Sequence, residues 1–169
     1  MSKTFILGGA RSGKSRYALE LGESCSEDRV FVATAQGFDE GMRERIARHR
    51  SDRDVSWRTV EEMVEVWDVI GAEDRVGRVI VLDCLTLWLN NLMLDGRDVE
   101  ADLERLVACL EGVNGDVILV SNEIGLGLVP DTELGREFRD LHGRMNQAVA
   151  AVCDRVLFMV AGLPVVVKG

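Results

Sequence analysis

Thr4-Phe5-Ile6-Leu7-Gly8-Gly9-Ala10-Arg11-Ser12-Gly13-Lys14-Ser15 is the stretch that decides the fold, and it runs from an apolar segment into a glycine-rich loop. Its last eight residues match G-x-x-x-x-G-K-[ST], the Walker A pattern of a phosphate-binding loop. Gly8 and Gly13 permit backbone conformations that residues with a Cβ avoid, so the loop can turn its N–H groups toward phosphate oxygens. The strand before the loop and the helical pattern after it supply the context that the motif requires. They favour a nucleotide site over a glycine turn without a ligand.

The residues of this loop have distinct expected roles. Lys14 is expected to contact the terminal phosphates and to act in catalysis, and the Ser15 hydroxyl is expected to bind Mg²⁺. A helix beginning near Lys14 would direct its positive N-terminal end at the same phosphates. The nucleotide-binding residues predicted here are Gly8, Gly9, Ala10, Arg11, Ser12, Gly13, Lys14 and Ser15.

Composition narrows the class of protein. The chain has 169 residues, which predicts a single domain over residues 1–169. Its net charge of -9 argues against nucleic acid or an anionic membrane as a partner. No apolar run reaches the roughly 18 residues that a membrane span needs, and the chain opens on a core strand rather than a signal peptide. We therefore expect a cytoplasmic protein whose four cysteines are reduced.

Apolar runs alternate with amphipathic segments after the phosphate-binding loop. This alternation predicts βαβ units and an α/β fold with a mainly parallel sheet. Further strands are expected over residues 29–34, 55–59, 78–83, 116–121, 155–160 and 164–167. Helices are expected over residues 15–21, with Gly22 as the stop, and over residues 39–50, 61–70, 86–94, 99–110 and 132–154.

Asp83 ends the apolar run of residues 78–83, where a carboxylate suits a Walker B role in holding Mg²⁺. The alternative is that Asp83 caps the following helix. Mg²⁺ is expected rather than Zn²⁺, because oxygen donors converge here and the sequence has no cluster of Cys and His.

His49 is one of only two histidines, and it lies in an arginine-rich segment of an acidic protein. The arginines are Arg43, Arg45, Arg48, Arg50 and Arg53. They indicate either an anion-binding segment or a solvated helix with Glu–Arg pairs. An imidazole beside a bound triphosphate could attack the α-phosphorus as a nucleophile. His142 lies in the middle of a predicted helix, which favours a structural or surface role.

Several further motifs occur in order along nearly the whole chain. They are Ala33-Thr34-Ala35, Arg45-Ile46 with His49, Trp57-Arg58-Thr59 with Glu61, Asn122-Glu123-Ile124-Gly125 with Gly127 and Val129-Pro130, and Phe138-Arg139-Asp140 with Gly143-Arg144 and Asn146-Gln147. With the loop and its following Arg16, this set resembles the bifunctional adenosylcobinamide kinase / adenosylcobinamide-phosphate guanylyltransferase family of cobalamin synthesis. The resemblance implies a P-loop NTPase-type three-layer fold, a homotrimer, and a histidine that becomes guanylylated, a position that His49 occupies.

The resemblance also implies substrates and contacts. The expected reactions phosphorylate adenosylcobinamide and then transfer GMP from GTP to adenosylcobinamide phosphate, with Mg²⁺ as the cofactor and with ATP or GTP as phosphoryl donor. Beyond the loop, the GTP contacts carried over by position are Ala33, Thr34, Ala35, Arg50, Ser51, Asp52, Arg53, Glu61 and Asp83. The chain departs from the sequence pattern of some family members at two places. Some relatives have two adjacent histidines where this chain has Arg48-His49, and some have Glu where it has Asp83.

Two other functions remain open at this point. One is a plain P-loop small-molecule kinase in which His49 has no role. The other is a nucleotide-binding switch or ATPase subunit without a small-molecule substrate, which the absence of a basic surface and of an extra domain disfavours. A covalent GMP adduct is expected only of the bifunctional transferase.

Overall fold

A central sheet organises the chain, of which the computed structural model describes residues 2–36, 40 and 55–169. The described strands form one seven-stranded sheet in the order β3-β2-β4-β5-β1-β6-β7. Neighbouring strands are parallel except for the β6–β7 pair, which is antiparallel. The expected mainly parallel sheet is therefore confirmed. The strands are β1 (Lys3–Gly8), β2 (Asp28–Ala33), β3 (Trp57–Glu61), β4 (Arg78–Asp83), β5 (Asp116–Asn122), β6 (Arg155–Val160) and β7 (Leu163–Lys168).

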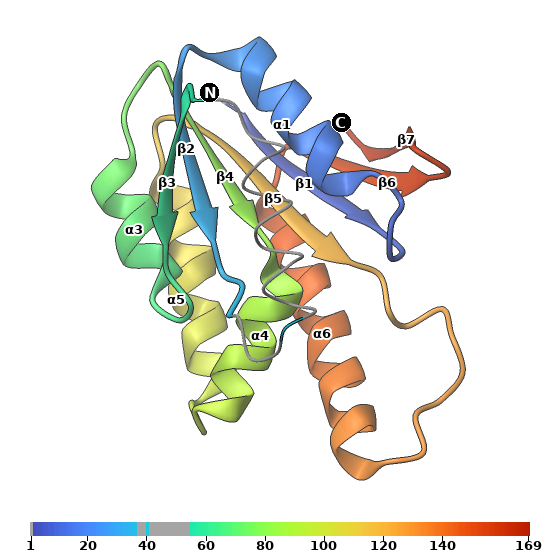
Figure 1. Cartoon of the computed structure of the whole chain (residues 1–169). Helices are drawn as coiled ribbons and strands as arrows, with labels where there is room; N and C mark the ends of the chain where they lie inside the picture. The colour runs from blue at the N-terminus through green and yellow to red at the C-terminus, as the bar shows by residue number, and fades with distance from the viewer. Residues whose placement is uncertain (1, 37–39, 41–54) are drawn as a thin grey trace.

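Helices cover both faces of this sheet and complete a three-layer α/β architecture (Figure 1). α1 (Lys14–Cys25) lies on one face, where strand residues such as Ile6 and Val81 form one apolar cluster. The second cluster, with Phe5 and Leu82, packs against the helices of the other face. Alternate strand residues thus enter opposite cores, as period-two side-chain directions require. The helices of that second face are α3 (Val66–Glu73), α4 (Leu85–Leu94), α5 (Val99–Gly112) and α6 (Glu133–Val152).

Helix α1 does not end at Gly22, so this sequence prediction is wrong. The helix continues through Gly22 to Cys25. A Cβ on Gly22 would lie 2.6 Å from Cη2 of Trp57, so the missing side chain makes room for the indole ring rather than ending the helix. Trp57 is buried and meets Phe31 edge-on at a centroid distance of 6.3 Å.

The strand and helix expected over residues 55–59 and 61–70 are displaced toward the C-terminus. β3 pairs with β2 from Trp57 opposite Arg29 to Glu61 opposite Ala33, so residues 60 and 61 belong to the sheet. Glu62 Oε1 then accepts hydrogen bonds from the N–H groups of Val64 and Glu65, which forms a turn before α3 begins. The helix expected over residues 39–50 lies, except for residue 40, outside the described residues.

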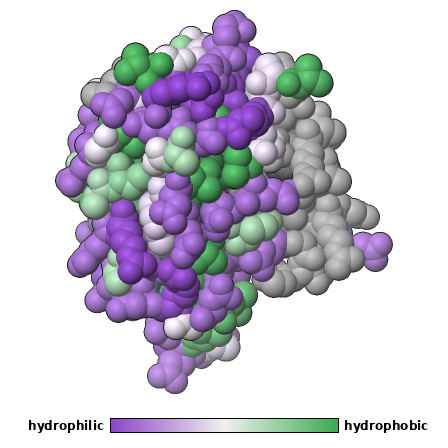
Figure 2. Space-filling model, turned by 90° about the vertical axis from the view of Figure 1, so that its left-hand side faces the viewer, coloured by the Kyte–Doolittle hydropathy of each residue, from purple (hydrophilic) through white to green (hydrophobic). Residues whose placement is uncertain are grey.

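The surface on the α3 and β3 side of the molecule is mostly hydrophilic. Figure 2 shows this side, on which the apolar residues are scattered among polar ones. None of the helices in the described part of the chain has both the length and the apolar composition of a membrane span.

Candidate nucleotide-binding site

Four strand ends bring the predicted site residues to one edge of the sheet. In the strand register, Gly8 of β1 lies opposite Asn122 of β5, and Ala33 of β2 lies opposite Asp83 of β4. Asp83 in turn lies opposite Val120 of β5. The carboxyl ends of parallel strands form the usual ligand edge of open α/β sheets, and the phosphate-binding loop and Asp83 meet at that edge.

The phosphate-binding loop depends on its two flanking glycines. A Cβ on Gly8 would lie 2.7 Å from Ser12 Oγ and 2.8 Å from the Met159 carbonyl oxygen. Gly13 has a φ of 93° and precedes the first residue of α1 without any side-chain cap. The first N–H groups of α1 therefore point out of the helix toward the loop, where they can donate to an anion.

The loop is also held from outside by the β6–β7 turn, a contact that sequence reasoning missed. Ala161 and Gly162 have φ values of 51° and 82°, and the Gly162 N–H donates to the Ser12 carbonyl oxygen at 3.1 Å. A two-residue turn between two apolar strands predicts a hairpin. This local sequence pattern does not indicate which other loop the turn will contact.

Lys14 is buried although it carries a positive charge. Its Nζ donates to the Gly9 carbonyl oxygen at 2.6 Å and lies 3.5 Å from Ser12 Oγ. Because burial of an ammonium group is costly unless it is paired, these contacts hold the charge inside the loop. The Lys14 ammonium is thus placed where phosphate oxygens bound by the loop would meet it.

Asp83 has a buried carboxylate oxygen at the same edge. Oδ2 has no hydrogen-bond partner among the residues that the structure describes. The N-cap residue of α4 is Cys84 and has no side-chain cap hydrogen bond, so the capping interpretation of Asp83 is wrong. A buried carboxylate oxygen needs a compensating donor or cation. Together with the Ser15 hydroxyl it gives the hard oxygen donors that suit Mg²⁺.

Thr34 lies at the same edge, but its side chain is used inside the protein. Its hydroxyl donates to the Cys84 carbonyl oxygen and accepts from the Cys84 N–H, each at 2.8 Å. The Thr34 carbonyl oxygen accepts from Asn91 Nδ2 at 2.9 Å. Ala33 and Ala35 flank this residue, and Glu61 is exposed at the end of β3 opposite Ala33.

Comparison with known proteins places these features in a family. The family model described as cobinamide kinase / cobinamide phosphate guanyltransferase matches residues 4–167. The chain belongs to this family. A bifunctional adenosylcobalamin biosynthesis protein of Pseudomonas aeruginosa is 47% identical over 99% of this chain and 98% of its own length. A relative of the same description from Escherichia coli is 37% identical over 96% of this chain and 98% of its own length.

Solved structures with a similar fold are distant in sequence. The RadB recombinase is 19% identical, with a TM-score of 0.55 over 93% of this chain and 73% of its own. A prototypical ATPase from the type III secretion system of pathogenic bacteria is 12% identical, with a TM-score of 0.55 over 94% of this chain and 51% of its own. At such identities the likeness shows the fold alone, and it confirms the P-loop NTPase-type architecture expected for the cobinamide kinase / guanyltransferase family.

His142 lies behind this edge in a buried polar network. Only 1% of its surface is exposed, which excludes the surface alternative and favours the structural one. Its Nε2 lies 3.0 Å from Thr86 Oγ1 and 3.4 Å from Ser121 Oγ, and its Nδ1 lies 3.3 Å from Asn146 Nδ2. Loss of hydration on burial lowers the pKa of His142 to about 4, and the nearby Glu123 carboxylate opposes this shift.

The network ends on the backbone beside the phosphate-binding loop. Thr86 Oγ1 accepts from the Asn122 N–H at 2.9 Å, and Asn146 Nδ2 donates to the Asn122 carbonyl oxygen at 3.2 Å. Since Asn122 lies opposite Gly8, the network fixes the strand end next to the loop. The sequence signals for it are the polar pair Ser121-Asn122 after an apolar strand and the motif residues Asn122 and Asn146.

The remaining predicted site residues of this family member lie outside the described residues. They are His49, Arg50, Ser51, Asp52 and Arg53. Their roles stay predictions.

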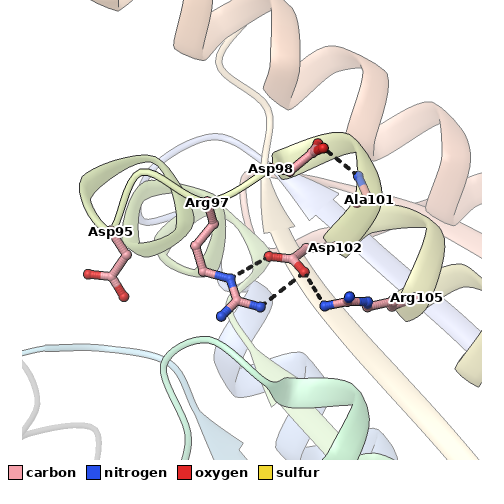
Figure 3. A pocket seen from close by; sticks show the side chains of 6 residues that line it. All are labelled: Asp95, Arg97, Asp98, Ala101, Asp102 and Arg105. Carbon is pink, nitrogen blue, oxygen red and sulfur yellow. Dashed lines mark hydrogen bonds and ion pairs between the residues drawn. The ribbon is translucent and has the colours of Figure 1, made fainter.

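A separate pocket of about 530 Å³ lies at the α4–α5 turn. Arg97 and Arg105 both point at Asp102 and bind its carboxylate (Figure 3). The two guanidinium groups also lie 5.9 and 5.7 Å from the Trp67 ring centroid. The cations of this pocket are thus paired within the protein. Its lining residues are Asp95, Arg97, Asp98, Ala101, Asp102 and Arg105, none of which belongs to the phosphate-binding loop.

Proposed function

We propose that this chain phosphorylates adenosylcobinamide and then transfers GMP from GTP to adenosylcobinamide phosphate, giving adenosylcobinamide-GDP for the nucleotide loop of cobalamin. The match of residues 4–167 to the cobinamide kinase / guanyltransferase family supports both reactions. The observation in the structure that carries the proposal is the meeting of the phosphate-binding loop with Asp83 at one sheet edge. That arrangement suits phosphoryl chemistry.

In the kinase step, the loop N–H groups and Lys14 hold the phosphates of ATP or GTP. The hydroxyl of the aminopropanol arm attacks the γ-phosphorus, the bond to the β–γ bridging oxygen breaks, and the hydroxyl proton is released. Positioning and charge neutralisation supply most of the catalysis in such transfers. The buried ammonium of Lys14 is already held in the loop by Gly9 and needs little rearrangement to meet the phosphates.

Mg²⁺ is part of the proposal, with Ser15 and Asp83 as the residues that would hold it. The unpartnered Oδ2 of Asp83 supports this assignment. When bound, Mg²⁺ supplies neutralisation of the phosphate charge. The protein's own contribution is to keep a carboxylate and a hydroxyl at the phosphate edge.

In the second step, a ring nitrogen of His49 is proposed to attack the α-phosphorus of GTP. A P–N bond forms, the bond to the α–β bridging oxygen breaks, and pyrophosphate leaves. A phosphate oxygen of adenosylcobinamide phosphate then attacks the same phosphorus, so the P–N bond breaks and a diphosphate link forms. A covalent intermediate divides one displacement into two easier ones.

The location, oligomeric state, partners and nucleotide contacts of the protein are also proposals. We propose a cytoplasmic homotrimer without nucleic acid or membrane partners. The nucleotide contacts proposed are the residues of the phosphate-binding loop with Ala33, Thr34, Ala35, Arg50, Ser51, Asp52, Arg53, Glu61 and Asp83. The net charge of -9 supports the expectation about nucleic acid and anionic membranes.

Mass spectrometry after incubation with GTP tests the guanylyl step. The wild type is expected to gain a GMP adduct on the peptide that contains His49, and His49→Ala is expected to lose the adduct and the GDP-linked product while still phosphorylating adenosylcobinamide. His142 remains in the variant, so an adduct there would be detected separately. Incubation with ATP in parallel identifies the nucleotide that forms the adduct.

Lys14→Ala is the matched control, because it should weaken both reactions rather than one. The expected loss is on the order of 10²-fold or more, as for other preorganised charge donors. Guanylyl transfer by His49→Ala would contradict the covalent mechanism. Loss of both activities in a folded His49→Ala protein would contradict the assignment of His49 to the second step alone.

A further inference from the structure

The loop between β5 and α6, residues 123–132, carries a group of exposed apolar side chains. In Figure 1 this orange loop extends outward from the body of the protein. Leu126, Leu128 and Val129 are 82%, 96% and 61% exposed. Single exposed apolar residues are common on protein surfaces, but several together in one loop indicate a contact surface.

Both ends of the loop are anchored by polar contacts, so the outward position of these side chains is a feature of the fold. At the first end, the Glu123 N–H donates to the Gly8 carbonyl oxygen at 3.0 Å, and Glu123 Oε1 accepts from the Gly125 N–H at 2.6 Å. At the other end, Arg136 donates to the carbonyl oxygens of Pro130 and Asp131 at 3.0 and 2.8 Å. These anchors use main-chain and charged groups and leave the apolar side chains for another molecule.

The loop is continuous with the nucleotide site. The N–H of its first residue, Glu123, donates a hydrogen bond to the Gly8 carbonyl oxygen. The backbone of the preceding Asn122 is held by hydrogen bonds to Thr86 and Asn146. The loop therefore starts directly beside the phosphate-binding loop, so an acceptor held by it would be close to the nucleotide.

We propose that Leu126, Leu128 and Val129 form the surface that binds the corrinoid acceptor and holds its aminopropanol arm toward the phosphate-binding loop. This inference rests on the proposed function, which supplies an acceptor with a large and partly apolar ring. Such a ring is bound mainly by burial of apolar surface. A second copy of the chain is the alternative occupant, and the sedimentation measurement below distinguishes it from the corrinoid.

The test compares the affinity for corrinoid with that for nucleotide. The double variant Leu126→Asn with Leu128→Asn removes apolar contact area at two exposed positions, where the fold should be unaffected. Its Kd for cobinamide, measured by equilibrium dialysis without nucleotide, and its KM for cobinamide should both rise at least about tenfold, as expected for the loss of a buried leucine. The KM for the nucleotide should stay unchanged.

Two further variants make the comparison specific. Val76→Asn changes another exposed apolar residue, 84% exposed before β4 at the opposite edge of the sheet, and should leave cobinamide binding unchanged. Leu128→Met keeps an apolar side chain of similar size and should retain binding.

The outcomes separate this inference from the proposed function. An active wild type with unchanged cobinamide binding in the double variant would overturn the inference and leave the function standing. An equal rise in the KM values for cobinamide and nucleotide would assign the loop to nucleotide binding. A change of oligomeric state in sedimentation would assign it to contact with another copy of the chain. Either result would also overturn the inference. A wild type that neither binds nor phosphorylates cobinamide would refute the function and the inference together.

Discussion

Thr34 and Cys84 are joined through one hydroxyl, which bonds both the N–H and the carbonyl oxygen of Cys84 at 2.8 Å. Thr34 follows β2, and Cys84 follows Asp83 at the end of β4. The Thr34 side chain is fully buried. A single hydroxyl can donate and accept at once. It thereby fixes the backbone directly after the carboxylate that we assign to Mg²⁺.

Replacing Thr34 with Val should therefore weaken both the fold and the metal site. The substitution keeps the branched shape but leaves the Cys84 N–H without this partner, which costs about 1–3 kcal/mol of unfolding free energy. The Mg²⁺ concentration for half-maximal activity should rise. Thr34→Ser retains the hydroxyl and is the control. Wild-type melting and Mg²⁺ titration in Thr34→Val would show that this link does not position Asp83.

Asp83→Asn should raise the Mg²⁺ requirement while preserving the fold. The amide keeps the size of the side chain but removes the charge that a hard cation prefers. Activity measured across a Mg²⁺ titration tests this expectation, and a denaturant melt checks folding. An unchanged titration curve would remove Asp83 from the metal site and leave its buried oxygen unexplained.

Gly22→Ala and Gly71→Ala should change stability in opposite directions, although both replace a helical glycine. Alanine favours a helix over glycine by roughly 0.5–1 kcal/mol. At Gly71 in α3 a Cβ meets no atom within 4 Å, so the variant should be more stable. At Gly22 the Cβ would clash with the Trp57 ring, so the variant should be less stable. Urea unfolding measures both, and a stabilised Gly22→Ala would contradict the packing argument.

Stability should fall as the pH falls below the usual pKa of histidine. The folded protein holds His142 neutral down to a pKa of about 4, whereas the unfolded chain protonates it near its ordinary value of 6.5. Between these values the unfolded state binds more protons, so acid favours unfolding. The full loss is on the order of 3 kcal/mol, and it should be complete only below pH 4.

Unfolding free energies of wild type and His142→Gln across this pH range isolate the effect. Glutamine can still hydrogen-bond but does not titrate, so its stability should depend less steeply on pH between 6.5 and 4. Parallel curves for the two proteins would contradict the assignment of this pH dependence to His142.

The strands were predictable where burial is continuous. Residues 78–83 form an apolar run that matches β4, because a parallel strand covered on both faces needs no alternation. The prediction that α1 ends at Gly22 was wrong because the glycine makes room for the ring of Trp57, a residue far away in the sequence. The helix expected over residues 61–70 begins later, at Val66, because pairing with Ala33 draws Glu61 into the sheet.

The site was predictable to the extent that its chemistry is local. The phosphate-binding loop carries its signal in eight consecutive residues, and the strand before Asp83 indicates its edge. The bonds of Thr34 to Cys84 and of Gly162 to Ser12 join distant segments and have no local pattern. The burial of His142 likewise depends on which residues α6 meets. The role of His49 and the single domain over residues 1–169 stay predictions.

The position of β1 in the sheet determines when the nucleotide site can form during synthesis. β1 pairs only with β5 and β6 among the described strands, and those strands begin at Asp116 and Arg155. The phosphate-binding motif therefore leaves the ribosome long before either neighbour exists, and closing such long loops is slow. A nascent chain is therefore not expected to hold a nucleotide before β5 and β6 have been made. Nucleotide binding by ribosome-bound chains would thus mark the completion of folding rather than its start.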